Sequence, residues 1–480
     1  MACVRRTDEV TESDRERRLE ERVRLLEHQL DYLRAELLHL VHEREKNVYS
    51  AAWLIFRPLR RFEAALVDAV SPVLRRLSRD AAAPALEPSA METPPATHPT
   101  TRARRLLVDV TATARHDAGT GIQRVVKKIT QALYRDDALP IPAVAVRCEG
   151  GRLFTCEAFV AALGGEPAGP DREIEIAPGD RFFMLSDSWN AFEEFQPIFA
   201  RIRAGGGEIV TCVFDLIPVL YPHACHEVTP PRYEAWLRRA LVESDAFLAI
   251  SRTVAEQLAE FVAKAGAPHR PGLAIGWFHC GSDITEAAPA APRPEIAAAA
   301  AGGAMFLSVG TLEPRKGHRV ALRAFDALWR AGRDARLVFV GRRGWFEEAI
   351  VAEIRGHAEF GRRLFWFDDV GDAELAFLYD ESAAALVPSY AEGFGLPISE
   401  AARRGRPVIC SDIPVFREVG GAGAVYFRVN DPQALAERIA DFLDGRVSAD
   451  PSQVSRASWA EAAHRVAQVI ATEDWSQRLP

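Results

Sequence analysis

A series of short apolar runs separated by amphipathic helical segments constrains the fold of this chain more than any other feature. Between residues 304 and 411 the chain contains the runs AMFLSVG, ARLVFVG, RLFWF, AAALVP and RPVICS, with helical segments such as HRVALRAFDALWRAG between them. The runs are apolar throughout, which is typical of parallel strands that helices cover on both faces. The pattern predicts a Rossmann-like, doubly wound α/β domain over residues 304–480.

An earlier region, residues 105–285, shows the same alternation. It contains the strand-like runs RRLLVDVTA, DRFFML, EIVTCVFD and DAFLAI, and helical segments such as YEAWLRRALVES. An Ala- and Pro-rich segment, 286–303, joins the two regions and is predicted to be a linker. The predicted fold class is therefore α/β, with two Rossmann-like doubly wound domains facing a cleft between the carboxyl ends of their sheets.

The N-terminal region is predicted to be helical and to self-associate. Leucines and one valine are spaced by four and three residues in turn between residues 19 and 40, at Leu19, Val23, Leu26, Leu30, Leu33, Leu37 and Leu40. This heptad pattern predicts a coiled coil over residues 8–46 and a homo-oligomer formed through 19–40. The alternative is a single amphipathic helix that packs on its own domain.

Two further segments precede the α/β regions. Residues 47–80 mix aromatic and aliphatic residues with clustered arginines, a composition typical of an amphipathic helix that contacts anionic lipid head groups. Peripheral membrane contact through residues 50–77 is therefore one hypothesis, and a helical hairpin packed on a domain is the other. Residues 81–104, rich in Ala, Pro, Thr and Ser, are predicted to be a flexible linker.

Bulk composition excludes several classes of protein. The net charge of −8 provides no general basic field, which argues against nucleic-acid binding. The seven cysteines are scattered singly without a CxxC pair, so neither a disulfide framework nor a zinc knuckle is indicated. Without a signal-peptide pattern or an apolar run of about 18 residues, the expected location is cytoplasmic, with peripheral contact at the inner face of the cytoplasmic membrane as a hypothesis.

The loop after the first strand of the second domain carries two adjacent cations. In SVGTLEPRKGH, Arg315 and Lys316 stand just before a helix, at the predicted carboxyl edge of the sheet. Two cations beside a helix N-terminus suit a diphosphate, because the helix dipole and both charges attract the same anion. The alternative is a solvated basic turn.

The second chemical feature is SYAEGFGLPISEA, in which Glu392 and Glu400 are eight positions apart. Between them lie residues suited to an anion site at a helix start, namely Gly393, Phe394, Gly395, Leu396 and Pro397. Glycines let backbone N–H groups approach a phosphate, and proline favours the first helical turn. Glu400 would lie one turn inside that helix, where it could accept both hydroxyls of a ribose. Glu392 could then face the sugar of the donor.

These motifs resemble those of the family-4 retaining glycosyltransferases of GT-B fold, also known as group 1. AEGFGLPISEA resembles the E-x7-E signature of that family, and EPRKG resembles its phosphate-binding loop. The resemblance implies that Arg315 and Lys316 bind the donor diphosphate, that Glu400 binds the ribose, and that Glu392 contacts the transferred sugar. Backbone groups from Gly395 to Pro397 would assist, and Gly310 would belong to the same donor site.

The resemblance extends to the first domain. GTGIQRVV, with Gly119, Thr120 and Gly121, and VFDLIPVLYPHACH, with Asp215, resemble the acceptor-side loops of the family. Many relatives have a histidine before that aspartate, whereas this chain has Phe214. A helix N-cap is the alternative role for Asp215.

The segment LVFVGRRGWFEEAI, with Gly341 and Arg342, resembles that of bacterial mannosyltransferases that build surface polysaccharide. The expected activity is therefore transfer of a hexose, mannose from GDP-mannose, to a growing lipid-linked glycan such as an O-antigen, with retention of configuration. Neither a metal ion nor a cofactor is expected, since the sequence contains no DxD motif and side-chain cations could replace a metal. The alternatives are an epimerase or hydrolase of the same fold, and a non-catalytic coiled-coil scaffold of an assembly complex.

Overall fold

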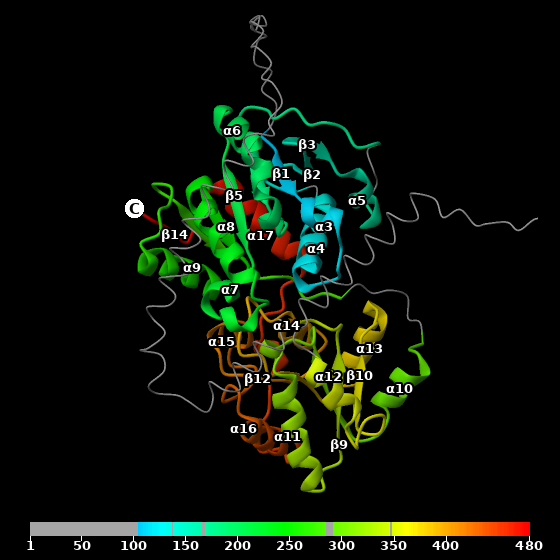
Figure 1. The fold of residues 1–480 in the computed structure, drawn as a ribbon. Helices are drawn as coiled ribbons and strands as arrows, with labels where there is room; N and C mark the ends of the chain where they lie inside the picture. The colour runs from blue at the N-terminus through cyan, green and yellow to red at the C-terminus, as the bar shows by residue number, and fades with distance from the viewer. Residues whose placement is uncertain (1–103, 137, 166–168, 285–290, 346–347) are drawn as a thin grey trace, which may run out of the picture. The chain divides into compact units, whose positions relative to one another are not determined.

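The structure, a computed structural model, describes residues 104–136, 138–165, 169–284, 291–345 and 348–480. The coiled coil expected at 8–46, the basic segment at 47–80 and all but the last residue of the linker at 81–104 lie outside these residues. The described part contains two sheets (Figure 1). None of its helices is long and apolar enough to cross a membrane.

The first sheet has eight strands in the order β14-β7-β6-β5-β4-β1-β2-β3. Their bounds are β1 Leu106–Asp109, β2 Ala143–Glu149, β3 Arg152–Thr155, β4 Arg181–Met184, β5 Ile209–Val213, β6 Ala246–Ala249, β7 Ala274–Trp277 and β14 Gln477–Arg478. The six central strands pair in parallel, and only the edge strands β3 and β14 are antiparallel to their neighbours. Strands β4, β5 and β6 are buried along their whole length, as their apolar composition predicts.

Helices and short 3-10 segments accompany this sheet. They are α3 Thr111–Arg115, α4 Gly121–Arg135, α5 Glu157–Ala162, η1 Ser188–Phe195, α6 Gln196–Ala204, α7 Ile217–Leu220, η2 Pro222–Ala224, α8 Thr229–Glu243, α9 Arg252–Ala265 and α17 Trp459–Thr472. The start of α4 is set by a capping box, in which the Thr120 hydroxyl accepts the Gln123 N–H and the Gln123 side chain binds the Thr120 N–H. Ser251 caps α9 through its side chain, which accepts the Val254 N–H.

The second sheet has six strands in the order β10-β9-β8-β11-β12-β13, and every neighbouring pair is parallel. The strands are β8 Ala304–Val309, β9 Ala335–Val340, β10 Leu364–Phe367, β11 Ala384–Val387, β12 Val408–Ser411 and β13 Val425–Phe427. The helical elements are α10 Pro294–Ala300, η3 Pro314–Lys316, α11 His318–Arg330, α12 Glu348–Arg355, α13 Asp372–Glu381, α14 Leu396–Arg403, α15 Pro414–Gly420, α16 Pro432–Leu443 and η4 Pro451–Gln453. The two parallel-sheet α/β domains predicted from the sequence are thus confirmed.

The segment expected to be a linker, 286–303, is helical in its second half. Pro294 occupies the first turn of α10, and four alanines follow Ile296, which is fully buried. Alanine is the strongest helix former and proline suits a helix start, so a composition interpreted as a linker forms a helix that packs against α13.

The chain returns to the first domain at its C-terminal end. Helix α17, coloured red in Figure 1, packs on α4, and β14 pairs with β7 at the edge of the first sheet. The range 304–480, expected to form the second domain alone, therefore includes about 20 residues that complete the first. The buried residues of α17 include Trp459, Val466 and Ile470, whose apolar face α4 covers.

A buried carboxylate ties the two domains together. Glu418, in α15, accepts the backbone N–H groups of Arg252 and Thr253 at 2.8 and 2.7 Å and the Thr253 hydroxyl at 2.6 Å. His279 Nε2 lies 2.7 Å from the same carboxylate. Because Arg252 and Thr253 begin α9, the positive end of that helix dipole favours the negative charge. Burial alone would raise the pKa of Glu418, but the hydrogen bonds from His279 and Thr253 outweigh it and lower the pKa to about 2.

This depressed pKa gives the domain contact a predictable pH dependence. The contribution of Glu418 should be complete above its ordinary pKa near 4.5 and be lost as pH falls from there toward 2. A shift of this size corresponds to about 3 kcal/mol. In urea titrations at pH 7, Glu418→Gln should therefore lower the free energy of unfolding by up to that amount, and the gap to wild type should shrink below pH 4.5. A gap that stays constant with pH would contradict this account.

Candidate functional site

Two glycine loops meet at the carboxyl edge of the second sheet. Strands β8 and β9 pair along their full length, from Ala304 opposite Ala335 to Val309 opposite Val340, so both end at the same edge. Gly310 and Gly341 follow directly, and a Cβ atom on Gly341 would lie 2.0 Å from the Gly310 carbonyl oxygen. Only glycine permits this approach, which leaves the loop backbones in contact beneath the Lys316 side chain.

Arg315 and Lys316 converge on one carboxylate. Lys316 Nζ lies 2.6 Å from Glu392 Oε1, and Arg315 Nη1 lies 3.0 Å from Glu392 Oε2. Arg315 Nε also pairs with Glu313 at 2.9 Å. The side chains of Arg315, Lys316 and Glu392 expose only 16%, 17% and 10% of their surfaces. These values do not fit the solvated basic turn considered as the alternative.

Burial and charge set the protonation states in this cluster. Burial would raise the pKa of Glu392, but Lys316 and Arg315 outweigh it and lower the pKa to about 2, so this carboxylate is ionised at neutral pH. Burial dominates at Glu313 and Asp215, where it raises the pKa despite Arg315 nearby. His318, buried beside Lys316, has its pKa lowered to about 4 and is neutral.

Helix α14 begins at the position the sequence predicts. Gly395 is its N-cap with φ of 99°, and Pro397 lies in its first turn. Glu400 lies about one turn inside and is 3% exposed, with the Tyr379 hydroxyl donating to Oε2 at 2.9 Å and Arg124 Nη1 3.4 Å from Oε1. Phe394, in contrast, is buried and packs against His279.

The loop between the two glutamates is in close contact with the first domain. A Cβ atom on Gly393 would lie 1.9 Å from the Phe214 carbonyl oxygen, and the Ser251 hydroxyl donates to the Gly393 carbonyl at 2.8 Å. Asp215 follows Phe214, and its Oδ1 accepts the Ile217 N–H at 2.9 Å in the turn before α7. The N-cap of α7 is Leu216, with no side-chain cap, so the helix N-cap considered for Asp215 is not formed. The Asp215 carboxylate is also close enough to Arg315 for the two charges to interact.

The glycine loop of the first domain contacts the predicted donor side. Gly119 has φ of 68°, and Arg342 Nη1 donates to the Ala118 carbonyl at 2.9 Å. The Thr120 hydroxyl takes part in the capping box of α4, and Gly121 is the first residue of that helix. The structure therefore brings residues of both domains to one place, around Gly310, Gly341, Lys316, Glu392 and Glu400.

Three residues at this site were not predicted. Arg124 and Ser251, both in the first domain, and Tyr379, in the second, contact Glu400 or the Gly393 loop. Helical spacing could have pointed to Arg124, since it stands four residues after Thr120 and therefore on the same face of α4. Nothing in the local sequence indicates Ser251 or Tyr379, because only the packing of the two domains, or of α13 against α14, places them there.

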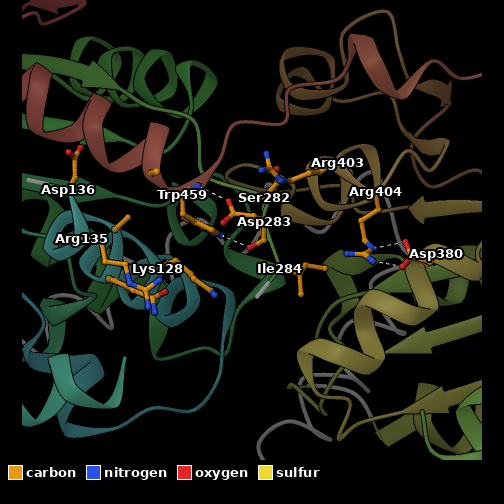
Figure 2. A pocket seen from close by; sticks show the side chains of 13 residues that line it. Lys128, Arg135, Asp136, Ser282, Asp283, Ile284, Asp380, Arg403, Arg404 and Trp459 are labelled. Carbon is orange, nitrogen blue, oxygen red and sulfur yellow. Dashed lines mark hydrogen bonds and ion pairs between the residues drawn. The ribbon is translucent and has the colours of Figure 1, made fainter. Parts of the chain in front are cut away.

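A cavity of about 1050 Å³ lies beside the two points where the chain crosses between the domains (Figure 2). Its lining includes Lys128 and Arg135 of α4, Asp283 at the first crossing, Trp459 at the second, and Arg404. Asp283 holds the crossings together, because its carboxylate and carbonyl accept the two N–H groups of Trp459 at 2.7 and 3.1 Å. Among the described residues, none that lines this cavity belongs to the predicted site.

Comparisons with known proteins give relatives of this chain. Residues 294–466 match the family model described as "Glycosyl transferases group 1". The serotype-specific mannosyltransferase WbdA of Escherichia coli is 32% identical over 347 residues, which cover 71% of this chain and 41% of that protein. The O-antigen chain mannosyltransferase B of Escherichia coli is 34% identical over 171 residues, which cover 34% of this chain and 43% of that protein. This chain thus spans about two fifths of the length of these relatives.

One solved structure supports the fold. The crystal structure of Anabaena Alr3699/HepE in complex with UDP-glucose superposes with a TM-score of 0.50 at 16% identity, over 77% of this chain and 97% of that protein. The fold of this chain is thus similar to that of Alr3699/HepE. Over residues 294–466 the chain is thus similar to the glycosyl transferases group 1, and over a longer stretch it is similar to the mannosyltransferase WbdA.

Proposed function

We propose that this protein is a retaining glycosyltransferase that moves mannose from GDP-mannose to a growing, lipid-linked surface glycan. The names of the relatives WbdA and O-antigen chain mannosyltransferase B support the sugar and the type of glycan. Peripheral membrane contact through residues 50–77 and self-association through 19–40 would bring the enzyme to a lipid-linked acceptor with avidity.

The observation that carries this proposal is the convergence of Arg315 and Lys316 on Glu392. Arg315 and Lys316 both lie within hydrogen-bonding distance of the Glu392 carboxylate, so their charged groups are close together. Such a pair of cations suits an anion with closely spaced charges, such as a diphosphate. Glu392 pairs with both cations and offsets one of their two positive charges. A bound diphosphate would take over that role, leaving the Glu392 carboxylate to face the transferred sugar.

The proposed chemistry needs only groups of the chain and its substrates. Arg315 and Lys316 stabilise the charge that develops on the leaving diphosphate, which is where preorganised electrostatics contributes most. The acceptor hydroxyl attacks from the same face, and the leaving phosphate takes its proton. Retention of configuration and independence of metal ions both follow from this scheme.

An epimerase or hydrolase of the same fold would use the donor without an acceptor, and a scaffold would need neither the paired cations nor Glu400. The mannosyltransferase relatives favour neither alternative.

The test is transfer by the purified full chain, in EDTA, from GDP-mannose and from competing UDP- and dTDP-sugars to lipid-linked acceptors. We expect mannosyl transfer from GDP-mannose with the anomeric configuration retained. Release of free mannose without glycan extension would indicate a hydrolase. If neither reaction occurs, but the assembly complex fails to form without this protein, the scaffold alternative would be indicated.

A further inference from the structure

Arg124 is a half-buried cation of the first domain that lies against two carboxylates of the second. Its Nη1 lies 3.4 Å from Glu400 Oε1, and its Nη2 lies 3.8 Å from Asp372 Oδ1. The capping box at Thr120 fixes the first turn of α4, and the Arg124 N–H closes that turn on the Thr120 carbonyl at 2.9 Å. Arg124 is therefore positioned by a well-defined helix start.

The guanidinium group of Arg124 has unused donors. Its Nε and Nη2 atoms are buried, yet neither has a hydrogen-bond partner within the described part of the chain. The Glu400 charge raises the pKa of Arg124, although burial acts in the opposite direction. A cation whose buried N–H groups are unpaired costs free energy, and a ligand oxygen at this point would recover it.

Glu400 offers the complementary chemistry. Its Oε2 is fixed by the Tyr379 hydroxyl, whereas its Oε1 faces Arg124 at a distance too long for a good hydrogen bond. A hydroxyl group is both a donor and an acceptor. A vicinal diol between the two side chains could therefore donate to the Glu400 carboxylate and accept from the Arg124 guanidinium.

We propose that Arg124 adds a first-domain contact to the ribose diol that Glu400 is expected to bind, so that the donor site is completed by a residue of the first domain. This inference rests on the proposed function. It extends the site across the domain contact: the nucleotide is recognised fully only when α4 lies against α14. Arg124 thereby couples donor recognition to the closed arrangement of the domains.

The test compares nucleotides that differ in one hydroxyl. Calorimetric titration of the full chain with GDP and 2′-deoxy-GDP should show GDP binding at least tenfold more tightly. Arg124→Ala should weaken GDP binding about tenfold, as expected for a lost charge-assisted hydrogen bond, and should change 2′-deoxy-GDP binding much less. Arg124→Lys, which keeps the charge but not the planar fork, should fall between the two.

Glu418→Gln is the matched control, because it removes another tie between the same domains without touching Glu400. If Arg124 only held the domains together, both variants would weaken the two nucleotides equally, and the assignment would be overturned. Wild-type binding of GDP with no change in Arg124→Ala would overturn it as well, while leaving the proposed function intact. Failure of the wild-type protein to bind either GDP or UDP would instead refute the proposed function and, with it, the role of Arg124.

Discussion

Replacing Lys316 by alanine is expected to slow glycosyl transfer by about a hundredfold or more, with a smaller effect on donor affinity. The Lys316 ammonium lies 2.6 Å from Glu392 and above the Gly310 loop, and is largely buried. In the proposed reaction it faces the charge that grows on the leaving diphosphate, and removing one preorganised donor of this kind typically costs two to three orders of magnitude in rate. The measurement is single-turnover transfer from GDP-mannose.

Arg343→Ala provides the control for the Lys316 variant. Arg343 lies on the neighbouring loop after β9, is exposed, and stacks over Trp366 instead of joining the ion-pair cluster. The substitution Arg343→Ala removes one positive charge, as Lys316→Ala does, and should leave the transfer rate within about twofold of wild type. Equal losses in the two variants would mean that the general positive field, and not the position of Lys316, accelerates the reaction.

A second large effect is expected from Gly393→Ala, a substitution that adds only one carbon atom. That carbon would lie 1.9 Å from the Phe214 carbonyl oxygen and 3.1 Å from the Asp215 Cβ, both in the first domain. Because the nearest atom is backbone, the domains must separate by about 1 Å, and a displacement of this size at a reacting centre can cost about a hundredfold in rate. Transfer rates, together with hydrogen exchange at the start of α9, would measure the loss of closure.

Gly371→Ala is the appropriate comparison for Gly393→Ala. Gly371 is exposed at the N-cap of α13, and a Cβ atom there would meet nothing within 4 Å. We expect nearly normal transfer and nearly normal exchange in this variant. Full activity in Gly393→Ala would show that the close approach to Phe214 is not needed for catalysis.

The sequence predicted the two sheets well because buried parallel strands are apolar along their whole length. Strands such as β5 and β8 therefore appear as continuous runs. The hairpin of β2 and β3 was not predicted, although Gly150 and Gly151 at its turn were a usable signal. The helix α10 was missed because its alanines and prolines were interpreted as a flexible linker.

The structure brings predicted residues together where the sequence concentrates them in short motifs. Arg315, Lys316, Glu392 and Glu400 are brought together around the carboxyl edge of one sheet, as their positions after strands predict. Ser251 could not be found in this way, because more than 100 residues separate it from Gly393, and the one local signal for Arg124 is its helical spacing from Thr120. Contacts of that kind depend on how two domains pack, which no local pattern encodes.

The return of α17 and β14 to the first sheet affects the order in which the protein can fold. Until residues 459–478 have left the ribosome, the apolar face of α4 lacks its covering helix and the edge of β7 has no neighbour. Domains generally fold from the N-terminus during synthesis, and uncovered apolar faces and open strand edges favour aggregation. The domain that begins first is therefore completed last, so a ribosome stalled within the second domain would hold a nascent chain that depends on chaperones.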